Sequence, residues 1–236
     1  MLKGKVSIII PCFNEEETIS DVIERVKRVD LGLEKEVIVV DDGSTDSSFE
    51  KASKHDGVIV VRHERNMGKG AAVKTGIAHS TGDVIVIQDA DLEYLPEDIP
   101  GLLVPLLRGE ADAVYGSRFL GSIEGMSLSH MLGNRVLSWA TRILFGARIT
   151  DMMTGYKLFR REVVDGLELK SKRFEFEPEI TAKLLKRGVR IVETPIRYSA
   201  RKKGEAKIRW KDGLICLWWL VKERLGGRGN EGKAGG

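Results

Sequence analysis

The sequence predicts an α/β protein with a mainly parallel sheet and helices on both faces. Short runs that are apolar and rich in β-branched residues recur along the first half of the chain, as expected for strands buried on both faces: "KVSIIIP", "EVIVVDD", "VIVVRH", "DVIVIQD" and "ADAVYGS". Candidate helices alternate with the first four runs. Polar residues follow several runs, and open α/β sheets bind ligands at the carboxyl ends of their strands.

The expected helices in the first half are residues 15–29, which open with acidic residues, 47–54 and 70–79. Beyond Tyr115 the pattern changes to longer helices near 127–145, 177–187 and 212–224, with a short strand pair in "VRIVETPIRYS". We expect one domain over residues 1–225. The remainder, 226–236, carries no apolar residue beyond alanine and is expected to be a flexible tail.

Composition excludes several classes of protein. A net charge of +3 is too small to indicate a nucleic-acid binder, and the chain shows no stacking platform or recognition motif. Segment 201–211 nevertheless holds six basic residues and one acid, which suggests a local anionic partner. Cys12 and Cys216 lack metal-ligand spacing, and neither a secretory signal nor an apolar stretch of about 18 residues is present. A reduced, cytoplasmic protein is the simplest interpretation.

Three carboxylates follow the apolar run that ends at Ile87, in "VIVIQDADLEYLP". If the strand continues, Asp89 and Asp91 point the same way. Two carboxylates held together repel each other unless a cation lies between them, and a hard ion such as Mg²⁺ or Mn²⁺ suits them. The alternative is a polar turn before a helix, with Glu93 and Glu97 near the positive end of its dipole.

Two further segments follow strands. "VVDDGSTDSS" could form a turn, a helix N-cap and a hydrogen-bonding pocket for a nucleobase or ribose, or only a strand–turn–helix junction. "ERNMGKGAAV" lacks the spacing of a phosphate-binding P-loop. Gly68 and Gly70 are therefore expected to allow either tight packing or close approach to a diphosphate.

Four motifs in order, "SIIIPCFNEEETI", "VIVVDDGSTD", "RNMGKGAAVKTGI" and "IQDADLEYLPEDI", resemble the nucleotide-sugar half of family 2 glycosyltransferases over about residues 5–120. The resemblance implies a GT-A fold with a Rossmann-like nucleotide-binding half. It also implies that the motif Asp89-Ala90-Asp91 holds a metal on the donor diphosphate. Family members often have tyrosine at position 13, so a phenolic contact would be missing while stacking could persist. The residues expected to contact the nucleotide are Pro11, Phe13, Glu15, Val40, Asp42, Ala90 and Asp91.

The downstream motifs, among them "GNRVLSWATRILFG", "TDMMTGYKLFRREVV" and "RKKGEAKIRWKDG", are similar to dolichol-phosphate mannose synthases and related polyprenyl-phosphate hexosyltransferases. This implies a donor half (about 1–120) and an acceptor half (about 121–225), with Glu93 as the third metal residue. It further implies inverting transfer of mannose from GDP-mannose to dolichyl or another polyprenyl phosphate. The basic residues expected around the acceptor phosphate and the donor are Arg118, Arg135, Arg201 and Lys207.

Several alternatives remain open at this point. The donor could be UDP-glucose, the acceptor another saccharide, or the protein a nucleotide-sugar-binding regulatory subunit without transfer activity. Arg135 could be an ordinary solvated side chain, because its helix has an apolar stripe. Asp151 is a candidate for contact with the sugar or acceptor, whereas His63, His79 and His130 show no partner pattern and are assigned no chemistry.

A polyprenyl acceptor implies access to a bilayer, and we expect peripheral association with the cytoplasmic face of a membrane, possibly through a membrane-anchored partner. The basic segment 201–211 would meet anionic headgroups while Trp210, Trp218 and Trp219 settle at the interface. The alternative is that the apolar segment 214–221 packs on the body of the domain.

Overall fold

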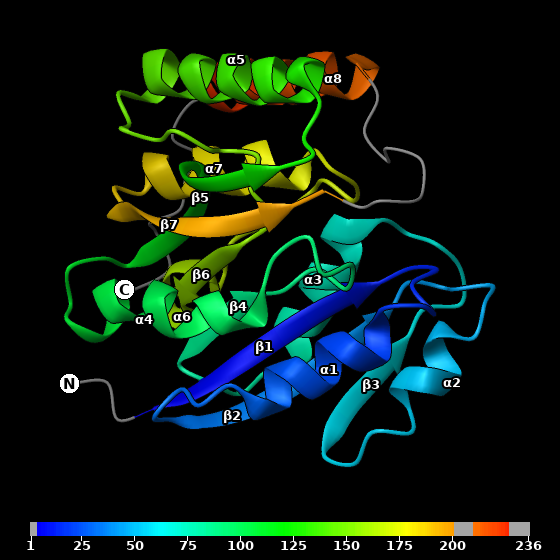
Figure 1. Cartoon of the computed structure of the whole chain (residues 1–236). Helices are drawn as coiled ribbons and strands as arrows, with labels where there is room; N and C mark the ends of the chain where they lie inside the picture. Colours follow the sequence, from blue (N-terminus) through cyan, green and yellow to red (C-terminus); the bar gives the residue numbers. More distant parts are fainter. Residues whose placement is uncertain (1–3, 201–209, 227–236) are drawn as a thin grey trace, which may run out of the picture.

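The computed structural model describes residues 4–200 and 210–226, and these form one sheet with helices on both faces (Figure 1). The strands are β1 (Lys5–Cys12), β2 (Glu34–Asp41), β3 (Val58–Arg62), β4 (Val84–Ile87), β5 (Ala113–Glu124), β6 (Lys157–Arg160) and β7 (Ile191–Ser199). Their order within the described part of the chain is β3-β2-β1-β4-β6-β5-β7. Neighbouring strands are parallel except at β6, which runs antiparallel to both β4 and β5. The predicted mainly parallel sheet is therefore confirmed.

Helices lie in three positions relative to the sheet. Their bounds are α1 (Ile19–Arg28), α2 (Ser48–Ala52), α3 (Lys69–His79), α4 (Ile99–Leu107), α5 (Leu128–Phe145), α6 (Arg161–Val164), α7 (Phe176–Lys186) and α8 (Trp210–Leu225). Helices α1 and α4 bury their apolar sides on one face of the sheet, and α3 and α7 bury theirs on the other. Helices α5 and α8 form an outer layer over α7, at the top of Figure 1.

The central strand β1 explains why the strand sequences are continuously apolar. Ile8 and Ile10 pack in the cluster beneath α1 and α4, whereas Ile9 packs against α3 and α7 on the opposite face. All three are completely buried. Each such side chain contributes about 2 kcal/mol by leaving water. A strand covered on both faces therefore has no exposed position for a polar residue until it reaches its carboxyl end.

Three sequence expectations are corrected. The "VRIVETPIRYS" segment forms the single strand β7, parallel to β5, and not a strand pair. Helix α1 begins at Ile19 and not at residue 15; in the segment before it, the backbone amides of Asn14 and Glu15 donate to the hydroxyls of Ser44 and Ser48. Strand β4 ends at Ile87, so Asp89 and Asp91 lie on a turn and not along a strand. The tail 227–236 lies outside the described residues, and the expected domain boundaries stay a prediction.

Glu36 joins the start of β1 to the loop before β4. Its carboxylate accepts hydrogen bonds from the Ser7 hydroxyl (2.6 Å) and from the amide and hydroxyl of Thr81, and it pairs with Lys5 at 2.7 Å. Burial alone would raise its pKa, but these partners outweigh burial and lower the pKa to about 2. This stabilisation is present above the ordinary pKa of 4.5 and is lost as the pH falls towards 2.

Replacing Glu36 with glutamine is therefore expected to lower the free energy of unfolding at pH 7 by roughly 1–2 kcal/mol, a value discounted for partial solvent screening. The difference from the wild type should shrink as the pH falls from 4.5 to 2. Urea unfolding at a series of pH values measures it. A difference independent of pH would show that the carboxylate charge is not the cause.

Candidate active site

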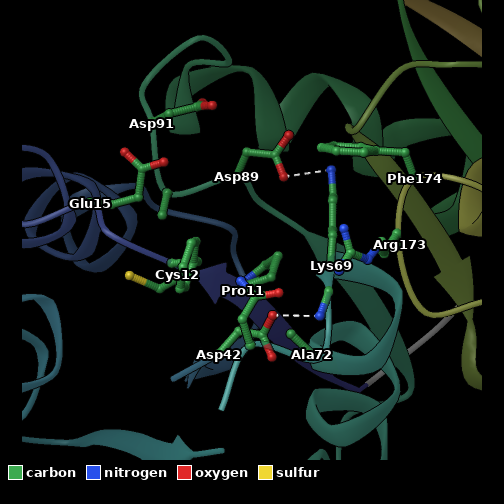
Figure 2. Close-up of a pocket in the computed structure, with 14 residues that line it drawn as sticks. Pro11, Cys12, Glu15, Asp42, Lys69, Ala72, Asp89, Asp91, Arg173 and Phe174 are labelled. Atoms are coloured by element: carbon green, nitrogen blue, oxygen red, sulfur yellow. Dashed lines mark hydrogen bonds and ion pairs between the residues drawn. The ribbon is translucent and has the colours of Figure 1, made fainter. Parts of the chain in front are cut away.

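A cavity of about 240 Å³ opens at the carboxyl ends of β1, β2 and β4 (Figure 2). Positions expected from the sequence that line it are Pro11, Phe13, Glu15, Asp42, Asp89, Ala90 and Asp91. The topology explains this convergence, because β1 lies between β2 and β4 and all three strands run in the same direction. The prediction that polar strand ends meet at one sheet edge is confirmed for β1, β2 and β4, whereas "GSRF" lies within β5 and does not line the cavity. Lys69, Arg173 and Phe174 also line the cavity and were not anticipated from the sequence.

Asp42 shapes the side of the cavity next to the start of α3. Its Oδ1 accepts hydrogen bonds from the Met67 amide (2.9 Å) and lies 2.7 Å from His63 Nδ1, while its Oδ2 accepts from the Gly68 amide (2.7 Å). The other ring nitrogen of His63 lies 2.9 Å from the Thr75 hydroxyl on α3. His63, to which sequence patterns assign no chemistry, thus braces Asp42 and the loop that leads into α3.

Gly68 and Gly70 allow tight packing, which was one of the two sequence expectations for them. Gly68 has a φ of +97°, and a Cβ there would lie 2.4 Å from the carbonyl oxygen of Lys172. A Cβ on Gly70 would lie 2.9 Å from Cβ of Phe176. Because only glycine permits this approach, the 170–175 loop can dock against the start of α3 and bring Arg173 and Phe174 to the cavity (Figure 2).

A chain of alternating charges runs from the cavity into the core. Lys69 Nζ lies 2.7 Å from Oδ1 of Asp89 and 3.5 Å from Oε1 of Glu177 (Figure 2 shows the first pair). Oε2 of Glu177 in turn pairs with the fully buried ammonium of Lys157. Burial alone would lower the pKa of Lys69, but Asp89 and Glu177 outweigh it and hold the pKa above its ordinary value. Lys69 is therefore a charged ammonium at neutral pH.

Gly155 makes room for the Asp89–Lys69 pair. A Cβ at this position would lie 2.3 Å from Oδ2 of Asp89 and 2.8 Å from Nζ of Lys69. Its backbone amide is held by the Tyr94 hydroxyl at 3.2 Å. The glycine belongs to the "MMTGYKLF" segment, whose sequence alone gives no sign of this contact.

Asp89 and Asp91 carry the oxygen donors that a hard divalent cation prefers. Both carboxylates line the cavity, and Mg²⁺ typically binds through one or two carboxylates, with substrate phosphates and water completing its shell. Within residues 4–200 and 210–226, no group of three or more His, Cys, Asp or Glu side chains converges as a metal site. Glu93 accepts a hydrogen bond from the Tyr198 hydroxyl at 3.0 Å, and its role as a third ligand stays a prediction.

The alternative interpretation of "VIVIQDADLEYLP", a polar turn before a helix, also describes part of this segment. The turn after Asp91 leads into a 3₁₀ turn (Pro96–Asp98) and then α4. Glu97 pairs with Arg25 of α1 at 2.6 Å. Asp89 and Asp91 therefore line the cavity, whereas Glu97 lies at the junction with the helix.

Arg118 does not line the cavity and forms a buried ion pair with Asp151. Its Nε and Nη2 donate to the two carboxylate oxygens of Asp151, each at 2.7 Å, and its backbone amide donates to Oδ2 at 3.0 Å. Asp151 is fully buried. Glu193 accepts from the backbone amides of Thr150 and Asp151, both at 2.8 Å, and burial raises the pKa of Glu193. Asp151 thus holds Arg118 and does not line the cavity.

Other predicted site residues lie apart from the cavity. The Val40 side chain is completely buried against Ile38 and Ala72, so it supports the cavity floor without lining it. Arg135 is exposed on α5, with its guanidinium carbon 5.1 Å from the centroid of the Phe119 ring. Arg201 and Lys207 lie outside the described residues.

Sequence comparison identifies related proteins over most of the chain. Residues 7–167 match the model of the family described as Glycosyl transferase family 2. A dolichol-phosphate mannosyltransferase of Pyrococcus furiosus is 35% identical over 214 residues, which are 88% of this chain and 60% of that protein. An undecaprenyl-phosphate mannosyltransferase of Micrococcus luteus is 31% identical, over 94% of this chain and 99% of that protein. The chain thus spans about three fifths of the length of the first of these relatives.

Solved structures show the same fold. The glucosyl-3-phosphoglycerate synthase of Mycobacterium tuberculosis, in complex with Mn²⁺, UDP and glucosyl-3-phosphoglycerate, aligns with a TM-score of 0.73 and 26% identity, over 93% of this chain and 78% of that one. A second structure of that enzyme, with Mg²⁺ and UDP, aligns with a TM-score of 0.72 and 25% identity, over 93% of this chain and 77% of that one. The expected GT-A fold is confirmed.

Proposed function

This chain belongs to glycosyl transferase family 2, and from that premise we propose that it transfers a hexose, with inversion, from a nucleotide sugar to a polyprenyl phosphate. Mannose from GDP-mannose is the leading donor because two related proteins carry mannosyltransferase names. One observation carries the proposal: the cavity combines a nucleotide side at Pro11 and Asp42 with two carboxylates and a lysine ammonium. UDP-glucose is the second candidate, supported by the structural likeness to an enzyme crystallised with UDP-glucose.

The proposed reaction needs no general base, because a phosphate monoester is already ionised at neutral pH. Its oxygen attacks the anomeric carbon, the bond from that carbon to the donor diphosphate breaks, and the nucleoside diphosphate leaves. Mg²⁺ or Mn²⁺ on Asp89 and Asp91 would supply charge neutralisation to the departing diphosphate. Phe13 would stack on the nucleobase, and Asp42, braced by His63, would fix the shape of the nucleotide side. These residues hold the donor in line for attack.

We also propose that Arg135 contacts the acceptor phosphate, because it is exposed on α5 beside Phe119 and a guanidinium grips phosphate oxygens well. Replacing Arg135 with alanine is expected to raise KM for the polyprenyl phosphate by roughly tenfold, the loss of one charge-assisted contact. KM for the donor should change less than twofold. Initial-rate kinetics in both substrates measure the two constants, and equal effects on both would contradict this role.

The outer helices α5 and α8 present a surface suited to a lipid layer. An apolar stripe along α5 is exposed, with Leu128 at 82% and Trp139 at 62% exposure, and Trp218 on α8 is 56% exposed. The opposite side of α8 packs inward through Cys216 and Leu220. Helix α8 therefore both packs on the domain and leaves apolar side chains exposed, so the two sequence alternatives are compatible. Across residues 4–200 and 210–226, no helix is long and apolar enough to span a bilayer.

We propose that this surface, defined by the exposed side chains of α5 and α8, seats the protein on the cytoplasmic face of a membrane. A Trp139→Glu, Trp218→Glu double variant is expected to reduce flotation with anionic liposomes at least fivefold, because two exposed aromatic side chains of this surface become charged. The control is Ile59→Glu on edge strand β3, which is 41% exposed and away from these helices. Unchanged flotation of the folded double variant would remove the membrane role from these helices. The side chain of Trp210 lies outside the described part.

Transfer of radiolabelled sugar from GDP-mannose and from UDP-glucose to dolichyl phosphate, each with Mn²⁺ or with a chelator, tests the function directly. A metal-dependent lipid product from GDP-mannose is expected. A lipid product formed only from UDP-glucose would show that the donor is UDP-glucose and not GDP-mannose. Metal-dependent donor hydrolysis without a lipid product would support a glycosyltransferase but contradict polyprenyl phosphate as the acceptor. The absence of both reactions would favour a nucleotide-sugar-binding regulatory subunit.

A further inference from the structure

Glu177 carries one carboxylate oxygen that the folded chain leaves without a hydrogen bond. The side chain is almost completely buried, and its Oε2 is taken by Lys157. Among the described residues, no donor makes a hydrogen bond to Oε1. The ammonium of Lys69 lies 3.5 Å from Oε1, but it bonds instead to Asp89 at 2.7 Å. A buried oxygen without a hydrogen bond costs about 1–3 kcal/mol, so its retention calls for a physical reason.

We propose that Glu177 is a positioning residue that receives the Lys69 ammonium when a divalent cation binds Asp89 and Asp91. This inference rests on the metal-dependent donor binding proposed above. A cation on Asp89 repels an ammonium that lies 2.7 Å from the same carboxylate. A shift of under about 1 Å would bring Nζ from 3.5 Å to normal hydrogen-bond distance from Oε1. The ammonium then remains neutralised without leaving the site.

The surroundings restrict where the ammonium can go. Gly155 closes one side, because even a Cβ there would lie 2.8 Å from Nζ. Lys157 is fixed by the carbonyl oxygens of Met152 and Thr154 and keeps Oε2 of Glu177 occupied. Oε1 is therefore the acceptor left open to Lys69. In the metal-free protein the Lys69 ammonium neutralises the carboxylate of Asp89. In the metal-bound protein it donates a hydrogen bond to Oε1 of Glu177.

If Lys69 moves from Asp89 to Glu177 when the cation binds, the effects of Lys69 and Glu177 substitutions on Mn²⁺ affinity should depend on each other. Lys69→Met removes the competing charge, so the variant should bind Mn²⁺ at least about fivefold more tightly (about 1 kcal/mol). Glu177→Gln removes the negative charge and, with its amide oxygen on Lys157, turns an NH₂ donor towards Lys69. The lysine then stays on Asp89, and Mn²⁺ should bind about tenfold more weakly. In the Lys69→Met background, Glu177→Gln should change Mn²⁺ affinity less than twofold.

The test is a double-mutant cycle for Mn²⁺ binding, measured by electron paramagnetic resonance on the full chain, alone and with GDP or UDP. Lys172→Met, on an exposed neighbouring lysine, is the control for loss of one positive charge and should leave the affinity unchanged. Equal weakening by Glu177→Gln in both backgrounds would mean that Glu177 acts only through its own charge, and would overturn the exchange. If the wild type binds no Mn²⁺ with either nucleotide, both the exchange and the proposed metal use are wrong. If it binds Mn²⁺ but shows no coupling, only the exchange is wrong.

Because Glu177 also holds Lys157, Glu177→Gln could unfold the protein, and a second measurement avoids that variant. Crystal structures of the wild type with and without Mn²⁺ locate Lys69 directly. Nζ within hydrogen-bond distance of Glu177 Oε1 in the Mn²⁺ complex, and on Asp89 without the ion, is the expected result. Nζ still on Asp89, or turned to solvent, in the complex would overturn the proposal.

Discussion

Replacing Asp89 with asparagine is expected to lower kcat/KM for sugar transfer at least about 10³-fold while the protein stays folded. Asparagine has the same shape, but it removes the charge that faces the cavity and pairs with Lys69. A neutral amide binds a hard divalent cation weakly. The departing diphosphate would also face a lysine ammonium whose position is no longer set by Asp89. Steady-state kinetics with Mn²⁺ and a chelator measure the loss.

The matched control for that variant is Asp165→Asn. Asp165 forms a weak, exposed ion pair with Arg161 at 3.6 Å, well outside the cavity lining. Its transfer rate should stay within twofold of the wild type, and thermal unfolding should show both variants folded. Full activity of Asp89→Asn, insensitive to a chelator, would show that Asp89 does not bind the metal on the donor.

The sequence predicts the part of the cavity at the strand ends for a local physical reason. Residues such as Asp42 and Asp89 directly follow apolar runs, and a strand buried on both faces most readily places polar groups where it ends. In parallel strands those ends meet at one edge, so position along the chain converts into proximity in space. Pro11, Asp42 and Asp89 could therefore be grouped before their contacts were known.

The parts of the structure that the sequence did not predict depend on contacts between residues far apart along the chain. Strand β6 is the short sequence "KLFR", with a charged residue at each end, and the charge of its fully buried Lys157 is balanced by Glu177 of α7. Lys69 and Glu177 are likewise far apart along the chain, and neither stands at a strand end. The contribution of Gly155 depends on the backbone passing beside Asp89. Partners chosen by tertiary packing leave no periodic signal in the sequence.

The second large effect is expected for Asp151→Asn, which should lower the free energy of unfolding by about 3–5 kcal/mol. Asp151 is fully buried and accepts three hydrogen bonds from Arg118. An asparagine would direct an NH₂ group at one guanidinium donor and leave a buried positive charge without a counter-charge. Urea unfolding at pH 7 gives the change in midpoint and slope.

A second ion pair in the same protein isolates burial as the cause. Arg190 contacts both oxygens of Asp112, at 2.7 and 3.0 Å, in the same two-pronged arrangement, but the arginine side chain is 58% exposed. Asp112→Asn should therefore cost less than about 1 kcal/mol. Equal losses in the free energy of unfolding for the two substitutions would mean that hydrogen-bond geometry, and not burial, sets the energy of these pairs. The expected difference would instead show that burial sets the cost. Because the Arg118–Asp151 pair is buried, lost transfer in an Arg118 variant counts as loss of substrate binding only where that variant remains folded.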